Sequence, residues 1–312
     1  MGSPPSSFQN VKDLKFVIRL ANGNFTSSDG NSNNTITLKG LRASVHIDNA
    51  GGAMMGTLRA QIYGVTASHM NDLTSLPWDI SVVSPSGSGS FAKNLIQVFA
   101  IDGTQETLVY NGDILNCWGD YTAMPNTFLY IQAQIGYAAL VQTTSPLSIA
   151  SDTDVGTVMQ QIATAMGYQF ENNGVKGTVA KGTYLANTLM EQARNMMQAY
   201  KFWMYLDNTS PNTLAIAPYG QARNAVVPLV SPQTGLQGYP IFNSTGVNFT
   251  TDFNPDITFG GTIKMDTSIP KARGNWVIVS MSHELSSQTE NGPWKTIANG
   301  VLPITGAAQV GA

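Results

Sequence analysis

The chain has 312 residues, enough for two or three ordinary domains or one large one, and its 42% hydrophobic content argues against disorder. Only 11% of the residues are charged, against about 25% in typical soluble proteins, and the net charge is −3. The 16 Lys and Arg residues form no cluster, which argues against a surface that grips DNA phosphates. So little charge predicts a surface largely covered by neighbouring subunits; the alternative is the neutral polar surface of a secreted β protein.

Alternation with a period of two dominates from Asp13 to about Gln134 and predicts strands with one buried face. In Leu41–Asp48 the odd-numbered residues are apolar and the even-numbered ones polar. In Leu58–Tyr63 the residues at 58, 60 and 62 are expected to point inward. Further strands are predicted at residues 15–20, 95–101, 106–110, 113–118 and 128–135.

Turn signals separate these strands. The Asn111-Gly112 pair predicts a tight hairpin, because type I′ turns need positive φ at two successive residues. A short helix is predicted over Thr66–Leu76, ended by Pro77, and Ser84–Ser90 is expected to be a flexible loop. The whole region is typical of one antiparallel barrel or sandwich.

The pattern changes after Pro146. Between Asp154 and Met166 the apolar residues follow the spacing of an amphipathic helix, with Asp152 or Thr153 expected as its cap. A second helix is predicted over roughly Tyr184–Tyr200. A hairpin follows, from KFWMYL through a turn to TLAIA, and Pro228, Pro232 and Gly235 then mark a linker.

The last third again predicts short strands, from Gly246 to Val301, closed by Gly, Pro or Asn. Trp276 and Trp294 stand near the starts of two of them. We expect at least one of these two side chains to be buried, whereas exposure of both in a shared groove would indicate a sugar-binding platform.

Catalytic and metal-binding residues are not expected. The three histidines, His46, His69 and His283, are not at metal-ligand spacing from one another, and Cys117 is expected to be a buried small hydrophobe. Asp252, Asp256, Asp266 and Glu284 are predicted at turns or strand ends, where solvent and turn hydrogen bonds account for them. No serine-hydrolase or phosphate-binding motif occurs. The sequence leaves open that two carboxylates from separate loops come together as a site for glycan cleavage.

The N-terminal segment MGSPPSSFQN lacks the basic and apolar regions of a signal peptide, so none is expected. No window approaches 18 uninterrupted apolar residues, so we expect no membrane span.

The last third also carries a family resemblance. The Asn254-Pro255 turn followed by Gly260 and Gly261, the strand from Asn275 to His283, and the Trp-bearing strand from Trp294 to Val301 resemble the C-terminal barrel of the central baseplate hub proteins of contractile-tailed bacteriophages. That family includes the late control protein D group and, more distantly, the spike-bearing protein of type VI secretion.

The resemblance implies a mainly β fold in which two tail-tube-like antiparallel β-barrels flank a small α+β module. The expected segments are residues 1–145 for the first barrel, 146–230 for the module and 231–312 for the second barrel. It also implies a structural virion protein without enzymatic activity, cofactor or metal, located in the tail baseplate and assembled in the host cytoplasm.

The same resemblance implies partners. A homotrimer would join the tail tube protein to the central spike protein, contact other baseplate proteins and the tape measure protein, and line a channel that DNA passes in transit. Two alternatives remain open from the sequence: a tail-associated peptidoglycan-degrading enzyme and a carbohydrate-binding β protein.

Overall fold

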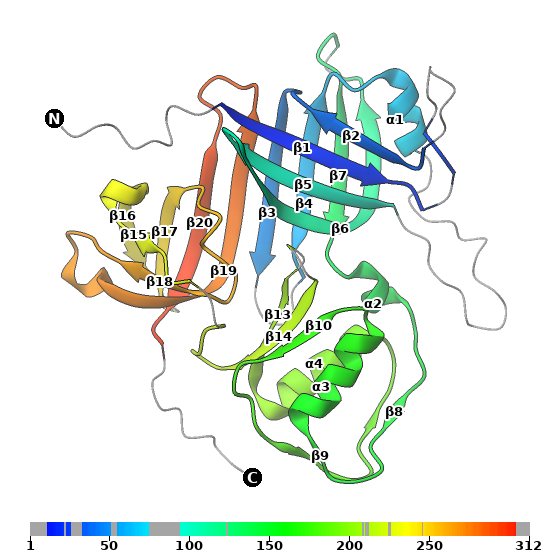
Figure 1. Cartoon of the computed structure of the whole chain (residues 1–312), viewed down its shortest axis with the longest axis vertical. Coiled ribbons are helices and arrows are strands. Elements are labelled where there is room, and N and C mark those ends of the chain that lie inside the picture. Colours follow the sequence, from blue (N-terminus) through cyan, green and yellow to red (C-terminus); the bar gives the residue numbers. More distant parts are fainter. Residues whose placement is uncertain are drawn as a thin grey trace. The chain divides into compact units, whose positions relative to one another are not determined.

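The computed structural model describes residues 11–21, 23–25, 33–50, 55–74, 94–122, 124–207, 209, 212–223, 226–244 and 246–303. In these residues the chain is mainly β, with strands that pair almost entirely antiparallel and a few short helices (Figure 1). The mainly β fold with a small α+β part is therefore confirmed. No closed barrel is detected among the described strands, so barrel closure stays a prediction.

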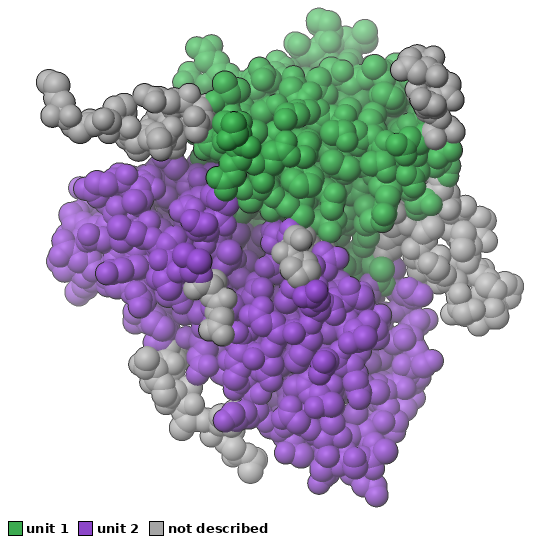
Figure 2. Space-filling model, viewed as in Figure 1, with its two compact units in different colours: residues 1–48, 56–138, 283–294 green, residues 49–55, 139–282, 295–312 purple. Residues whose placement is uncertain are grey.

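The chain divides into two compact units (Figure 2). Unit 1 comprises residues 1–48, 56–138 and 283–294, and unit 2 comprises residues 49–55, 139–282 and 295–312. This division cuts the chain differently from the three expected segments, since residues 283–294 join the first unit. The boundaries 1–145, 146–230 and 231–312 remain a prediction.

Unit 1 is built on antiparallel strands in the order β2-β1-β5-β6-β7-β4-β3, and β19 follows β3. The first elements are β1 (Lys12–Arg19), β2 (Thr35–Lys39), β3 (Ala43–Ala50), β4 (Thr57–Tyr63) and α1 (Ala67–Thr74). They are followed by β5 (Leu95–Asp102), β6 (Gln105–Asp120) and β7 (Phe128–Gln134). The helix predicted over Thr66–Leu76 is present as α1, whereas Pro77 and the Ser84–Ser90 loop lie outside the described residues.

The period-two pattern correctly predicted the buried face of unit 1. Leu58, Ala60 and Ile62 are fully buried, and Val45 and Ile47 of the neighbouring strand β3 are buried with them. Alternation places successive side chains on opposite faces, so the polar residues of β3 and β4 lie on the other face of the sheet.

The predicted Asn111-Gly112 hairpin is wrong. Both residues lie inside β6, which runs unbroken from Gln105 to Asp120, and neither has a positive φ. The chain reverses earlier, between Asp102 and Gln105, where Gly103 has a φ of +64°. Gly112 is instead needed for close approach, because a Cβ there would lie 2.6 Å from the hydroxyl of Tyr110.

Unit 2 begins with the helical module. Its elements are α2 (Tyr137–Val141), β8 (Leu147–Ser148), β9 (Thr153–Asp154), α3 (Val155–Ala165), β10 (Gln169–Asn172), β11 (Thr178–Val179), β12 (Tyr184–Leu185), α4 (Leu189–Tyr200), β13 (Phe202–Asp207) and β14 (Thr213–Pro218). The strands β10, β14 and β13 form a sheet in that order, with β10 parallel to β14. None of the helices in the described residues is long and apolar enough to cross a membrane.

Both predicted helices of the module exist, with different starts. The cap of α3 is Asp154 rather than Asp152 or Thr153, and its carboxylate accepts hydrogen bonds from the backbone N–H groups of Gly156 and Thr157. The second helix begins at Leu189, not at Tyr184, because Thr188 and Glu191 form a reciprocal capping box there. The residues expected to open it form β12 instead, which pairs with β8.

The rest of unit 2 is β. Its elements are β15 (Leu229–Val230), η3 (Pro232–Thr234), β16 (Leu236–Phe242), β17 (Val247–Asp252), β18 (Thr262–Met265), η4 (Pro270–Ala272), β19 (Gly274–Ser287) and β20 (Trp294–Val301). The sheet order is β16-β17-β20-β19, with β18 also paired to β19 and β15 paired to β18. Strand β19 contributes its first nine residues to unit 2 and its last five to unit 1.

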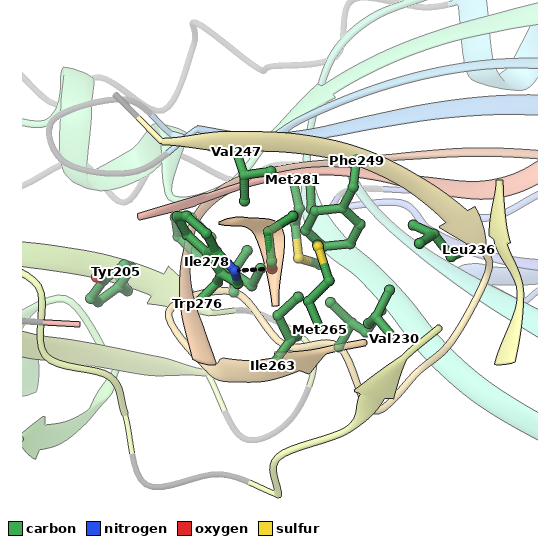
Figure 3. Packing of buried hydrophobic residues seen from close by; sticks show 14 of the residues in the cluster. Tyr205, Val230, Leu236, Val247, Phe249, Ile263, Met265, Trp276, Ile278 and Met281 are labelled. Atoms are coloured by element: carbon green, nitrogen blue, oxygen red, sulfur yellow. Dashed lines mark hydrogen bonds between the residues drawn. The ribbon is translucent and has the colours of Figure 1, made fainter. Parts of the chain in front are cut away.

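One hydrophobic cluster joins the C-terminal strands of unit 2 to the module hairpin. Side chains from β17, β18 and β19, among them Phe249, Met265 and Trp276, point toward one another in Figure 3. Tyr205 of the module's β13 belongs to the same cluster, with Ala215 and Ala217 of β14. The module hairpin and the C-terminal strands therefore share one core, which holds them together as a unit.

Candidate functional site

The three histidines are far apart in the sequence, and each has a different environment. His46 is on the polar face of β3, as predicted, with its Nε2 2.9 Å from Oδ2 of Asp48 and its Nδ1 4.0 Å from Oε1 of Glu284. His69 of α1 makes an edge-to-face contact with the ring of Phe25. His283 is buried, and burial lowers its pKa to about 4.

His46 and Glu284 border a cleft of about 380 Å³ on unit 1. Arg59, Gln61 and Tyr130 also line it, so both charge signs and an aromatic ring meet there. Glycan cleavage needs two placed carboxylates, and among the described residues Glu284 is the one carboxylate that lines the cleft. Among the described residues no group of three or more His, Cys, Asp or Glu side chains could hold a metal ion.

Cys117 is buried in β6, as predicted, and burial raises the pKa of its thiol to about 12. A thiol with that pKa is almost entirely protonated at neutral pH, and the thiolate is the nucleophilic form. The structure therefore gives Cys117 a packing role.

Two of the carboxylates singled out in the sequence serve local structure. Asp252 accepts a hydrogen bond of 2.7 Å from Nε2 of Gln237, which joins β17 to β16. Asp266 lies 3.7 Å from Arg273, and both side chains are more than half exposed. Asp256 follows the Asn254 turn, whose side-chain oxygen accepts from the Asp256 backbone N–H at 2.9 Å.

Both Trp276 and Trp294 are buried, at 3% and 7% exposure, so the expectation that at least one is buried is confirmed. The indole N–H of Trp276 donates to the carbonyl of Ala272 at 2.8 Å (Figure 3). Neither ring is available as an open sugar-binding platform.

The glycine before β18 has a clear physical role. Gly260 has a φ of +78°, a conformation that side chains with a Cβ rarely adopt. A Cβ there would lie 3.0 Å from Cδ of Arg223 and 3.1 Å from the ring of Tyr205. The carbonyl of Gly260 also accepts from the backbone N–H of Arg223.

Arg223 forms an ion-pair cluster that the sequence did not reveal. Its Nη2 lies 3.0 Å from Oε2 of Glu171 on β10, and its Nη1 lies 2.8 Å from Oδ2 of Asp207 on β13. Nη1 also donates to the carbonyl of Phe259 at 3.3 Å. With 13% of its side chain exposed, Arg223 fastens the helical module to the segment before β18 within unit 2.

The cluster shifts the pKa of every group in it. Burial raises the pKa of Glu171 and of Asp207, but hydrogen bonds and the charge of Arg223 outweigh burial and hold both below their ordinary values. Burial likewise lowers the pKa of Arg223, and the two carboxylates reverse that shift. All three groups are therefore charged at neutral pH.

Three of the exposed large apolar side chains of unit 2 lie on β16. Tyr239, Ile241 and Phe242 are 71%, 69% and 47% exposed, and β16 ends the sheet order. We call the outer side of β16 with these three side chains the β16 edge. Exposed apolar groups on an end strand are typical of an interaction surface. In the sequence the only sign of this exposed strand is the uncharged stretch LQGYPIF, to which the analysis of period-two alternation assigned no role.

Solved structures with the same fold come from tail and secretion machinery. The 43 kDa tail protein of prophage MuSo2 from Shewanella oneidensis shares 9% identity at a TM-score of 0.57, over 93% of this chain and 97% of that one. The tail protein from Neisseria meningitidis MC58 shares 8% at 0.56, over 92% and 96%. The E. coli c3393 protein, a type VI secretion component, shares 7% at 0.55, over 85% and 74%.

The fold is thus that of phage-tail proteins. The chain belongs to the family described as Baseplate hub gp41, which matches residues 21–297. A comparison with curated proteins finds no match in sequence. Membership of this family makes the chain a structural component of the virion tail baseplate.

Proposed function

We propose that the chain is the trimeric hub of a contractile-tail baseplate, where it joins the tail tube to the central spike and lines the channel through which DNA passes. The observation that carries the proposal is the baseplate hub family match across residues 21–297. The fold adds support, because the E. coli c3393 protein is described as structurally similar to the T4 tail proteins gp27 and gp5.

Composition supports a role inside an assembly. With 11% charged residues the surface is poor in the groups that keep a free monomer solvated. The net charge of −3 and the scattered cations predict weak binding to phosphates, which is compatible with a conduit that DNA must leave again. Tube, spike, other baseplate proteins and the tape measure protein are the proposed neighbours, after assembly in the host cytoplasm.

We assign no catalytic, cofactor-binding or metal-binding residue. The burial of Trp276 and Trp294 removes the feature that would have favoured a carbohydrate-binding protein. The His46–Glu284 cleft with its single carboxylate gives no support to a peptidoglycan-degrading enzyme. Residues 1–145 and 231–312 are proposed as the two tube-like domains around the module at 146–230.

The test is to locate and count the chain in purified tails. A full-length chain with a small C-terminal tag is expected at the baseplate by electron microscopy of tagged particles, in a ring of three copies around the tail axis. A location along the tube or on the tail fibres, or a single copy per tail, would overturn the hub assignment.

A further inference from the structure

The face of the unit 1 sheet that points away from its core carries aromatic, amide and basic side chains. Directly paired residues of neighbouring antiparallel strands project from the same face. Two rows of such residues cross β3, β4 and β7: Ser44, Gln61 and Tyr130 in one row, and His46, Arg59 and Gln132 in the next. We call this surface the β3–β4–β7 face. The cleft of about 380 Å³ is hollowed into it.

Arg59 is a cation of the cleft without an anionic partner. His46 lies beside two carboxylates, Asp48 at 2.9 Å and Glu284 at 4.0 Å. The Arg59 side chain is exposed, and within the part of the chain that the structure describes its guanidinium forms no ion pair or hydrogen bond. A planar guanidinium binds a carboxylate through two parallel N–H···O bonds. The cleft therefore offers a site for a carboxylate of another molecule at its Arg59 end.

A second exposed arginine, Arg42, lies on the same face. Its carbonyl accepts from the backbone N–H of Tyr63, which continues the pairing of β3 with β4, and its guanidinium carbon lies 3.7 Å from the centroid of the Tyr63 ring. A guanidinium stacked on a ring keeps the N–H groups at its edge free to donate. Residues 59 and 63 are separated by about 14 Å along the strand, at about 3.4 Å per residue. The face thus presents two carboxylate-binding groups at a defined spacing.

Aromatic rings accompany the two arginines. Tyr63 packs against Phe128 with ring centroids 5.3 Å apart, and Trp118 stacks on Tyr130 at 4.3 Å. The Trp118 side chain is 41% exposed. Arg, Tyr and Trp are the residue types in which the energy of protein–protein binding is concentrated. A surface built from them over this length fits a protein segment better than a small molecule.

The acidic groups of the face define which ligand fits. Glu284 borders the cleft on the β19 side, and Asp48 lies on β3 on the side of His46 away from Arg42. Both repel a further anion near Arg59, so a second carboxylate of the ligand is favoured only toward Arg42. Two acidic side chains four positions apart in an extended segment span the same distance of about 14 Å. A nucleic acid is disfavoured, because its successive phosphates would also lie next to the two acids.

We propose that the β3–β4–β7 face binds an extended acidic segment of another tail protein. One carboxylate of that segment pairs with Arg59 in the cleft, a second pairs with Arg42, and the residues between them pack on Tyr63 and Tyr130. The proposal rests on the chain's place in the baseplate and concerns unit 1 alone, so it does not depend on the trimer or the channel.

Zero-length cross-linking in purified tails tests the contact. Arg59→Lys keeps the positive charge and supplies an amine, which a carbodiimide couples to a carboxylate in direct contact. Mass spectrometry of digests should find an amide bond from position 59 to an Asp or Glu of another tail protein. Arg19→Lys on β1 is the matched control, since Arg19 is also exposed and forms no ion pair with the described residues, and it should give no such bond. No bond at position 59, a bond only to carboxylates of this chain, or an equal yield from the control would overturn the proposal.

Binding to the purified full-length chain distinguishes a peptide from a nucleic acid. The probe is a fluorescein-labelled peptide blocked at both ends, with two Glu residues four positions apart and Thr and Val elsewhere. By fluorescence anisotropy, Arg59→Gln and Arg42→Gln should each weaken its binding at least about fivefold, and Arg19→Gln should leave it unchanged. A peptide with Gln in place of both Glu residues should also bind at least about fivefold more weakly.

Two outcomes of that measurement contradict the proposal. One is equal binding of the acidic and the Gln-containing peptide. The other is a labelled DNA duplex that binds more tightly than the acidic peptide and is weakened by the same two substitutions, which would make the face a phosphate-binding surface. Either outcome leaves the hub assignment standing, because that assignment is tested by the location and number of copies in the tail.

Discussion

Replacing Arg223 by Met should destabilise unit 2 substantially. Methionine keeps an unbranched stem of similar reach but removes the charge and the donors that Glu171 and Asp207 share. The two carboxylates would then remain close together without a counter-ion, in a site where Asp207 is 19% exposed and Glu171 is 32% exposed.

The expected loss is about 3 kcal/mol of unfolding free energy. Removing one partner of a buried ion pair costs about 3–5 kcal/mol, because the remaining charge is uncompensated. The lower end applies here, since water reaches about a third of Glu171 and screens it.

The loss should also depend on pH. In the native chain both carboxyl pKa values are held below their ordinary values of 4.5 and 3.8, so their stabilising contribution is complete at neutral pH and fades as the pH falls through the lowered values. In Arg223→Met the hydrogen bonds from Asn173 to Glu171 and from Thr209 to Asp207 remain, but the bonds and the charge of Arg223 are lost, so burial raises both carboxyl pKa values relative to the native chain. The difference between native chain and variant should therefore be full at pH 7 and shrink below about pH 4.

Urea unfolding followed by tryptophan fluorescence, at pH 7 and near pH 4, measures both effects. Arg273→Met is the matched control, because Arg273 and its partner Asp266 are more than half exposed, and it should cost less than about 0.5 kcal/mol. If Arg223→Met costs no more than Arg273→Met at pH 7, or if its cost is the same at both pH values, the cluster does not stabilise the unit as argued.

Three further changes test other parts of the chain. Trp276→Ala should lower the unfolding free energy by about 3–5 kcal/mol in urea titrations, and a cost under about 1 kcal/mol would contradict its burial. His283 is neutral when buried, so the chain should lose up to roughly 3 kcal/mol as the pH falls from 6.5 to about 4, and His283→Gln should abolish that part of the loss. Cys117 should react with a thiol reagent at least about a hundredfold faster in urea than in buffer, and equal rates would refute its packing role.

Local periodicity was a sufficient guide wherever one face of an element is buried. The inward residues of β4 and the helix α3 follow directly from spacing, because burial of one face imposes a period of two or about 3.6. The hairpin predicted at Asn111-Gly112 was wrong, because the glycine is required there for a close approach to Tyr110 and not for a turn. A glycine's sequence context does not distinguish these two uses.

Features that depend on residues far apart in the chain could not be predicted. The Arg223 cluster joins positions 171, 207 and 223, and each of these charges taken alone looks like an ordinary solvated residue. The β16 edge was missed for a related reason: an uncharged strand has the same pattern whether its far side is paired or open. Pairing is a property of the sheet, which the linear sequence does not state.

The shared strand β19 has a consequence for how the chain is made. Unit 1 takes residues 283–294 from near the end of the sequence, and the hydroxyl of Ser287 donates to the carbonyl of Leu41 at 2.7 Å across 246 positions. A ribosome must therefore synthesise residues 49–282 before unit 1 can acquire its last strand. Until then one edge of β3 is unpaired, so the nascent chain is most prone to wrong strand pairing during synthesis. Folding should also be slow, because the entropy cost of closing so long a loop comes before the stabilising contacts between β3 and β19 form.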